Sequence, residues 1–111
     1  MATNANFRDI QQIAATTLQT PYTVVAGIIS SKISVMSFTN AAATGLVIDI
    51  YHNDGTTDFL KKTIRLPAGI GQEEIYYGFE RNVMLVGDSI KVQADAATAF
   101  NMFIHGTETS P

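Results

Sequence analysis

The back half of the chain, from Leu60 to Glu108, alternates apolar and polar side chains in short runs that tight turns separate. A two-residue period is typical of strands that bury one face against a core. Turns are indicated at residues 66–69, 86–88 and 94–97, and the first two contain glycine. Many short strands with frequent turns predict an all-β domain, an antiparallel β-sandwich that is jelly-roll-like and has a short N-terminal arm.

Seven or eight strands are expected, and three of them carry the clearest apolar stripes. The side chains that these three should point inward are Leu46, Ile48 and Ile50, then Ile90 and Val92, then Phe100, Met102 and Ile104. Strict alternation also predicts that Ile33 and Val35 share a face opposite Met36. Residues 52–55 have the sequence His-Asn-Asp-Gly, which is typical of a hairpin turn.

Residues 1–17 differ from the rest of the chain. Phe7, Ile10 and Ile13 recur every three residues, a spacing that predicts one or two turns of helix with an apolar stripe. A helix this short is marginal alone and must pack on something. It could fold back on its own domain, or it could be an arm that docks on a neighbouring subunit. We therefore divide the chain into an arm, residues 1–17, and a sandwich domain, residues 18–111.

The composition fits one folded domain of 111 residues, with 46% apolar and 15% charged residues. The net charge is −3 and the basic residues are scattered, so the concentrated positive field that nucleic-acid binding needs is missing. The chain has no cysteine, which excludes disulfides and thiolate metal sites. The N-terminus is not typical of a secretory signal, and no apolar run approaches the ~20 residues of a membrane helix. Neither nucleic acid nor membrane is an expected partner.

Reactive or metal-binding residues form no strong set. His52, Asp54 and Asp58 are the nearest to a metal cluster, but three such residues in a hairpin tip are more typical of a solvated turn. A calcium ion at Asp54 and Asp58 is the remaining alternative. Glu73 and Glu74 are adjacent and point to opposite faces of a strand, the wrong arrangement for a paired acid and base. The sequence predicts no enzyme, no catalytic residue, no metal site and no cofactor.

Aromatic residues crowd around Gly78. Tyr76 and Tyr77 are consecutive, so at least one of them must face outward if both lie on a strand. Exposed tyrosine is favoured at protein interfaces because a rigid ring buries a large area at a small entropy cost. The alternative is that Tyr77 and Phe79 belong to the core. The predicted interface residues are Phe7, Ile10 and Ile13 of the arm together with Tyr76, Tyr77 and Phe79.

Four segments, taken in order, resemble a group of small virion proteins of tailed bacteriophages. They are residues 16–27 (TTLQTPYTVVAG), 38–51 (FTNAAATGLVIDIY), 66–69 (LPAG) and 86–100 (VGDSIKVQADAATAF). The chain departs from the pattern of that group at Val25, where proline is usual, and at Ile28, where a basic residue is frequent. The resemblance implies a β-sandwich structural subunit of a virion and leaves open whether it belongs to the head, the neck or the tail.

From this resemblance and the lack of a reactive set we expect a capsid decoration, or cement, protein that binds and stabilises the assembled phage head. Its expected partners are the major capsid protein and copies of itself as a homotrimer. Its expected location is the capsid surface of the virion, reached from the host cytoplasm during assembly. One alternative is a neck or tail subunit. Another is a carbohydrate-binding module for host attachment, in which Tyr76 and Tyr77 near His52 would stack on sugars, although the chain has no tryptophan.

Overall fold

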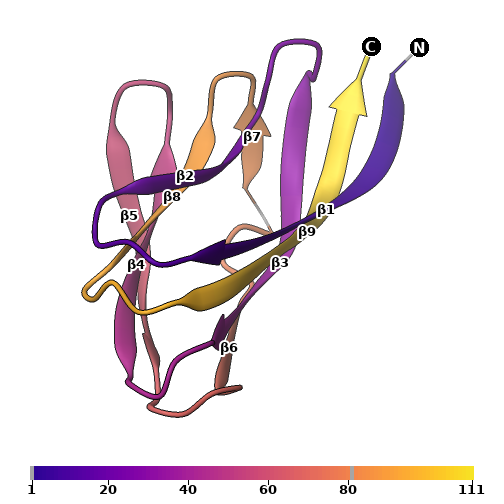
Figure 1. The fold of residues 1–111 in the computed structure, drawn as a ribbon. Helices are drawn as coiled ribbons and strands as arrows, with labels where there is room; N and C mark the ends of the chain where they lie inside the picture. The colour runs from indigo at the N-terminus through magenta and orange to yellow at the C-terminus, as the bar shows by residue number, and fades with distance from the viewer. Residues whose placement is uncertain (1, 81) are drawn as a thin grey trace.

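The computed structural model describes residues 2–80 and 82–111 and folds them into two facing antiparallel sheets (Figure 1). The strands are β1 (Thr3–Ile13), β2 (Gln19–Thr23), β3 (Ser30–Asn40), β4 (Leu46–Asn53), β5 (Asp58–Leu66), β6 (Glu73–Tyr76), β7 (Val83–Leu85), β8 (Ser89–Ala94) and β9 (Phe100–Ser110). Sheet A has the order β1-β9-β3-β6, with β7 also paired to β3, and sheet B has the order β2-β8-β4-β5. The predicted antiparallel β-sandwich is confirmed. No helix that could span a membrane occurs in the described residues.

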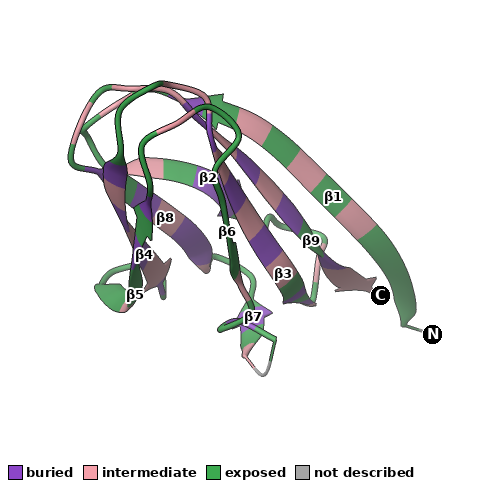
Figure 2. Cartoon of the chain, turned by 90° about the horizontal axis from the view of Figure 1, so that it is seen from below, coloured by how far each residue is buried: buried purple, intermediate pink, exposed green. Residues whose placement is uncertain are grey.

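The core lies between the two sheets and takes side chains from both. All of the side chains predicted to point inward from β4, β8 and β9 are buried. Figure 2 shows this alternation, as buried and less buried residues follow one another along β3 and β9. Each such side chain contributes about 1.5–3 kcal/mol when it is fully buried. These stripes therefore hold the two layers together.

A β-bulge in β3 changes which side chains enter the core. Successive residues of β9 pair with Ile33 and Val35, which leaves Ser34 as an extra residue. Beyond the bulge the alternation has the opposite parity, so Ile33 and Met36 are both buried while Val35 lies on the outer face. The prediction that Ile33 and Val35 share a face is wrong, because strict alternation assumes that no residue is inserted.

The helix predicted near the N-terminus is wrong, because β1 occupies its place. β1 pairs with β9 over its whole length, beginning with Thr3 opposite Ser110. The spacing of three places Phe7 and Ile13 on the inner face and Ile10 on the outer face. The partner strand supplies a full ladder of backbone hydrogen bonds, whereas a helix of one or two turns is unstable by itself. The described part of the arm is thus an edge strand of its own domain, and its role toward a neighbouring subunit stays a prediction.

Phe7 fastens β1 to both sheets. A Cβ on Gly106, directly opposite Phe7, would collide with the carbonyl oxygen of Lys32 and would lie 2.8 Å from Phe7 Cε1. The Phe7 ring therefore covers a position where only glycine fits. The same ring stacks on Tyr22 of β2, with 5.0 Å between the centroids and 9° between the planes. Because β2 belongs to sheet B, this contact ties the edge of sheet A to the opposite layer.

Replacing Phe7 with alanine should lower the free energy of unfolding by about 2 kcal/mol, because a half-buried ring is lost and Gly106 becomes exposed. Arg8→Ala, on the exposed face of the same strand, should change it by less than about 0.5 kcal/mol. Urea unfolding followed by circular dichroism measures both values. Negligible effects of both changes would mean that β1 is a loose arm.

Candidate interaction surfaces

The three predicted interface residues of the N-terminal segment lie in different environments. Phe7 is half-buried against Tyr22, and Ile13 is buried in the core. Ile10 has 53% of its surface exposed and lies on the outer face of sheet A. Of these three side chains, Ile10 is the one that is accessible to a partner.

The three predicted interface residues at the end of β6 and just after it also differ in exposure. Phe79 is buried, with its ring 5.9 Å from Tyr76 in an edge-on arrangement and 6.0 Å from the ring of His52. The chain turns here, since the Glu80 N–H donates to the Tyr77 carbonyl, and the turn carries Phe79 inward. Burial raises the pKa of Tyr76, whose ring is half-buried. Tyr77 is the tyrosine that faces outward, with its ring exposed to a partner.

The polar residues around the β4–β5 hairpin form hydrogen bonds with residues of nearby turns. His52 Nε2 lies 3.1 Å from the carboxylate of Asp88 in the β7–β8 turn. Asp54 accepts hydrogen bonds from two backbone N–H groups of its own turn, and Asp58 accepts one from the amide of Asn53. In the described part of the chain, no three His, Asp or Glu side chains gather as a metal site would require. Asn53, Asp54 and Asp58 thus form hydrogen bonds within their own hairpin turn. The lack of enzymatic activity stays a prediction.

The β2–β3 loop meets the β7–β8 turn at one end of the sandwich (Figure 1). Four large aliphatic side chains from these segments and the end of β7 are exposed. We call this cluster the apolar tip, and its members are Val25, Ile29, Leu85 and Val86. Two backbone hydrogen bonds join the loops, from the Gly87 N–H to the Val24 carbonyl and from the Val24 N–H to the Asp88 carbonyl. Exposed apolar clusters mark places where proteins dock. The sequence did not reveal the tip, because its members come from two segments that lie far apart in the chain.

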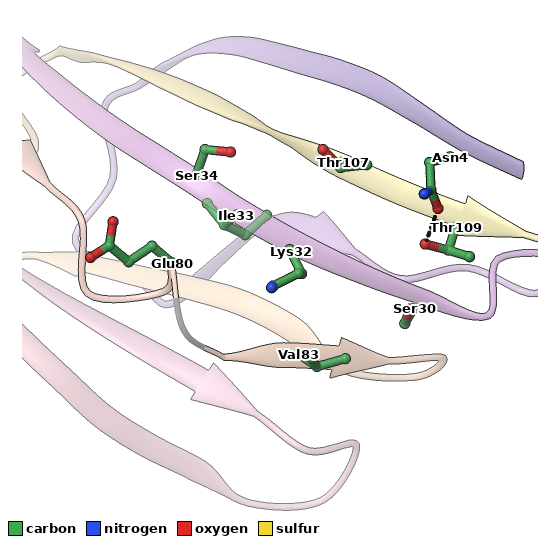
Figure 3. A pocket seen from close by; sticks show the side chains of 9 residues that line it. All are labelled: Asn4, Ser30, Lys32, Ile33, Ser34, Glu80, Val83, Thr107 and Thr109. Atoms are coloured by element: carbon green, nitrogen blue, oxygen red, sulfur yellow. Dashed lines mark hydrogen bonds between the residues drawn. The ribbon is translucent and has the colours of Figure 1, made fainter.

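A hollow of about 450 Å³ lies on the outer face of sheet A (Figure 3). It borders the tip through Ser30, which pairs with Leu85. Ser30, Ser34, Thr107 and Thr109 supply hydroxyl groups to it, and Lys32 and Glu80 supply charges. Asn4 accepts a hydrogen bond of 2.8 Å from Thr109 at its border. No aromatic ring is among the described residues that line it, so the hollow offers no ring on which a sugar could stack. Its hydroxyl and amide groups can bind polar side chains of another protein.

A row of three apolar residues and one serine crosses the outer face of sheet A. The strand register places Ile10 of β1, Phe103 of β9, Ser37 of β3 and Ile75 of β6 side by side. We call these four residues the outer row. Ile10 and Ile75 are exposed at its two ends, and Phe103 is partly covered between them. Few charges flank the row, as is typical of the central part of protein interfaces.

Tyr22 carries a buried hydroxyl that connects the two sheets. This hydroxyl lies 2.6 Å from that of Ser31 and donates a hydrogen bond of 2.9 Å to the carboxylate of Glu108. Burial is the main reason why the pKa of Tyr22 is raised to about 12. The hydrogen bond and the negative charge of Glu108 raise this pKa further, whereas the hydrogen bond with Ser31 lowers it. Since the hydroxyl already has two protein partners, we assign the network a structural role.

No protein-family model matches the chain, and no curated protein matches its sequence. Solved structures do match its fold. A chain of the Bacillus endospore appendages, a family of disulfide-linked pili, superposes with a TM-score of 0.54 at 16% identity, over 99% of this chain and 89% of the other. A chain from the acid-stable capsid structure of Helicobacter pylori bacteriophage KHP30 superposes with a TM-score of 0.53 at 8% identity, over 100% of this chain and 94% of the other. These likenesses show a shared fold.

The stability of the protein should fall above pH 10 because of Tyr22. Its hydroxyl ionises near pH 10.0 in the unfolded chain but keeps its proton to about pH 12 in the folded protein. Between these values the unfolded state binds fewer protons, so the free energy of unfolding, unaffected below pH 10, should drop by about 2 kcal/mol. Urea unfolding on both sides of this window measures the drop. In Tyr22→Phe this part of the drop should vanish, and an unchanged drop would contradict the assignment.

Proposed function

We propose that this chain is a structural protein of a bacteriophage virion and, more specifically, a decoration protein that binds the outside of the assembled head. The observation that carries the proposal is the apolar tip, which two hydrogen-bonded loops present at one end of the β-sandwich. The described residues offer surfaces for contact with other proteins, and no three His, Cys, Asp or Glu side chains among them gather as a metal site would require.

The fold supports this proposal. The order β1-β9-β3-β6 facing β2-β8-β4-β5 agrees with the jelly-roll expectation, which requires eight main strands in two sheets. A chain of a phage capsid structure has a similar fold over the full length of this chain and 94% of its own. Because one fold hosts many functions, the specific role has to rest on the surfaces of this chain.

The apolar tip fits a docking role on energetic grounds. Its four side chains are each about half exposed, so burying the remainder contributes about 1 kcal/mol per side chain. The backbone hydrogen bonds that join the two loops hold the tip in place before it binds, which reduces the entropy lost on docking. The hydroxyl groups of the adjacent hollow would add polar contacts at the rim of such an interface.

Stabilisation of the head would follow from mass action. A protein that binds the assembled shell better than free coat subunits shifts the equilibrium toward the closed shell. The proposed partner is therefore the major capsid protein in its assembled form, with the chain on the capsid surface. Copies would occupy equivalent positions on a symmetric shell. The homotrimer stays a prediction, and native mass spectrometry of the isolated protein measures the copy number.

The alternatives have weaker support. The similar pili are disulfide-linked, whereas this chain has no cysteine. Stacking on sugars would need an open pair of rings, but Tyr76 is half-buried against Phe79 and His52 is bonded to Asp88. A neck or tail subunit would use the same kinds of surface, and fractionation of particles into heads and tails distinguishes it.

Val86→Glu in the apolar tip should lower the occupancy of the protein on heads by about tenfold or more, because a charge would enter an apolar contact. Ile70→Glu is the matched control, since Ile70 is 77% exposed in the β5–β6 loop at the opposite end of the sandwich (Figure 1). Heads stripped of the protein and reloaded with each variant give the occupancies by quantitative mass spectrometry. Equal occupancies of the two variants would contradict a role of the apolar tip in head binding. Recovery of the wild-type protein with tails rather than heads would favour the alternative of a tail subunit.

A further inference from the structure

Three of the four sheet edges are protected against pairing with another strand. The β5 edge carries Lys61, Lys62 and Arg65 and is interrupted by a bulge where it pairs with β4. The β2 edge is five residues long, contains Pro21 and is itself irregular. The far edge of sheet A consists of β6 and β7, which have four and three residues. Lysine, proline, bulges and short strands are devices that keep edges from joining.

β1 forms the other edge of sheet A and has fewer of these devices, since it is long and has no lysine, no proline and no bulge (Figure 2). Its eleven residues pair with β9 in one unbroken register and contain no proline, glycine or lysine. Its two charges, Arg8 and Asp9, are opposite in sign, and the Asp9 carboxylate already accepts a hydrogen bond from Gln11. In the described residues, no other segment forms a backbone hydrogen bond with the outer edge of β1. Its unpaired N–H and C=O groups are a template for another strand.

We propose that β1 pairs antiparallel with β1 of a second copy of this chain, so that the two copies of sheet A join into one continuous sheet. The occupant of the edge has to be an extended strand, because only a strand satisfies a row of alternating backbone donors and acceptors. Among the described residues of a second folded copy, β1 is the long, regular edge without lysine, proline or a bulge. Two identical antiparallel strands are related by a twofold axis, so one contact satisfies both edges and the assembly closes.

Ile10 sets the register of this pairing, because it is the large apolar side chain that β1 exposes on the outer face. When Ile10 lies opposite Ile10 of the second copy, Arg8 faces Gln12. Asp9 then faces Gln11, and no like charges meet. A register centred on Arg8 or on Asp9 would instead place two like charges directly opposite each other. The Ile10 register also joins the outer rows of the two copies into one longer apolar row.

This pairing is a property of the isolated protein and does not depend on the proposed virion role. It makes a dimer the basic unit, in contrast to the homotrimer expected from the sequence. The apolar tip is not used in the pairing, because its members belong to the β2–β3 loop, β7 and the β7–β8 turn. Dimer formation and head binding can therefore be tested separately.

Single cysteines test the register, because the natural chain has none. Ile10→Cys should form a disulfide-linked dimer under mild oxidation, since directly opposite Cβ atoms lie about 4.5–5.5 Å apart. Arg8→Cys is the matched control on the same face of the same strand. Its counterpart would lie four residues further along the strand, about 13 Å away, and should stay unlinked. Faster linking at position 8 than at position 10 would overturn the proposal.

Native mass spectrometry of the isolated wild-type protein at micromolar concentration should show a dimer. Ile10→Lys should raise the dimer dissociation constant by about tenfold or more, because two lysines would lie directly opposite each other. Ile75→Lys is the matched control at the other end of the outer row, with 47% exposure against 53% for Ile10, and should leave the dimer intact.

Circular dichroism of Ile10→Lys should match that of the wild type, since the side chain is exposed and makes no core contact. A wild-type monomer or trimer would overturn the pairing of β1 and would leave the head-binding proposal standing. An intact dimer that fails to bind heads would contradict the head-binding proposal and would support the pairing of β1.

Discussion

The contact of Phe7 with Gly106 and Tyr22 is the interaction on which the rest of the arrangement depends. Gly106 leaves room for the Phe7 ring beside the backbone of β3, and the ring then reaches across to β2. The Tyr22 hydroxyl is held in turn by Ser31 and Glu108 from sheet A. The edge strands of two different sheets are thereby fastened to each other, and β1 becomes part of the sandwich rather than a free arm.

Fixing β1 in this way determines which surfaces the protein presents. The inner face of β1 is used by the core, while its outer edge and Ile10 remain open to a partner. At the end of the sandwich, two bonded loops present the apolar tip. His52 and Asp54 are engaged in hydrogen bonds that support turns. Contact with other proteins is the activity that we propose for these surfaces, and assembly into a particle would use such contacts repeatedly.

Local patterns predicted the inner faces of most strands but could not identify partners. Leu46 and its neighbours alternate cleanly, and a two-residue period depends only on adjacent residues. The spacing of Phe7, Ile10 and Ile13 fits both a helix stripe and a strand with alternating faces. The strand is favoured over the helix because this segment pairs with β9, which lies at the other end of the chain. The bulge at Ser34 likewise leaves no local signal, because it exists only relative to the partner strand.

The sequence by itself determined the fold class, the buried stripes and the lack of cysteine and of a concentrated basic patch, because these follow from composition and from the order of neighbouring residues. Only the tertiary structure decided that Phe79 is buried while Tyr77 is exposed, and that Val25 and Val86 share one tip. Surfaces and open edges form when distant segments pair. Their positions are set by the folded arrangement, and no run of adjacent residues encodes them.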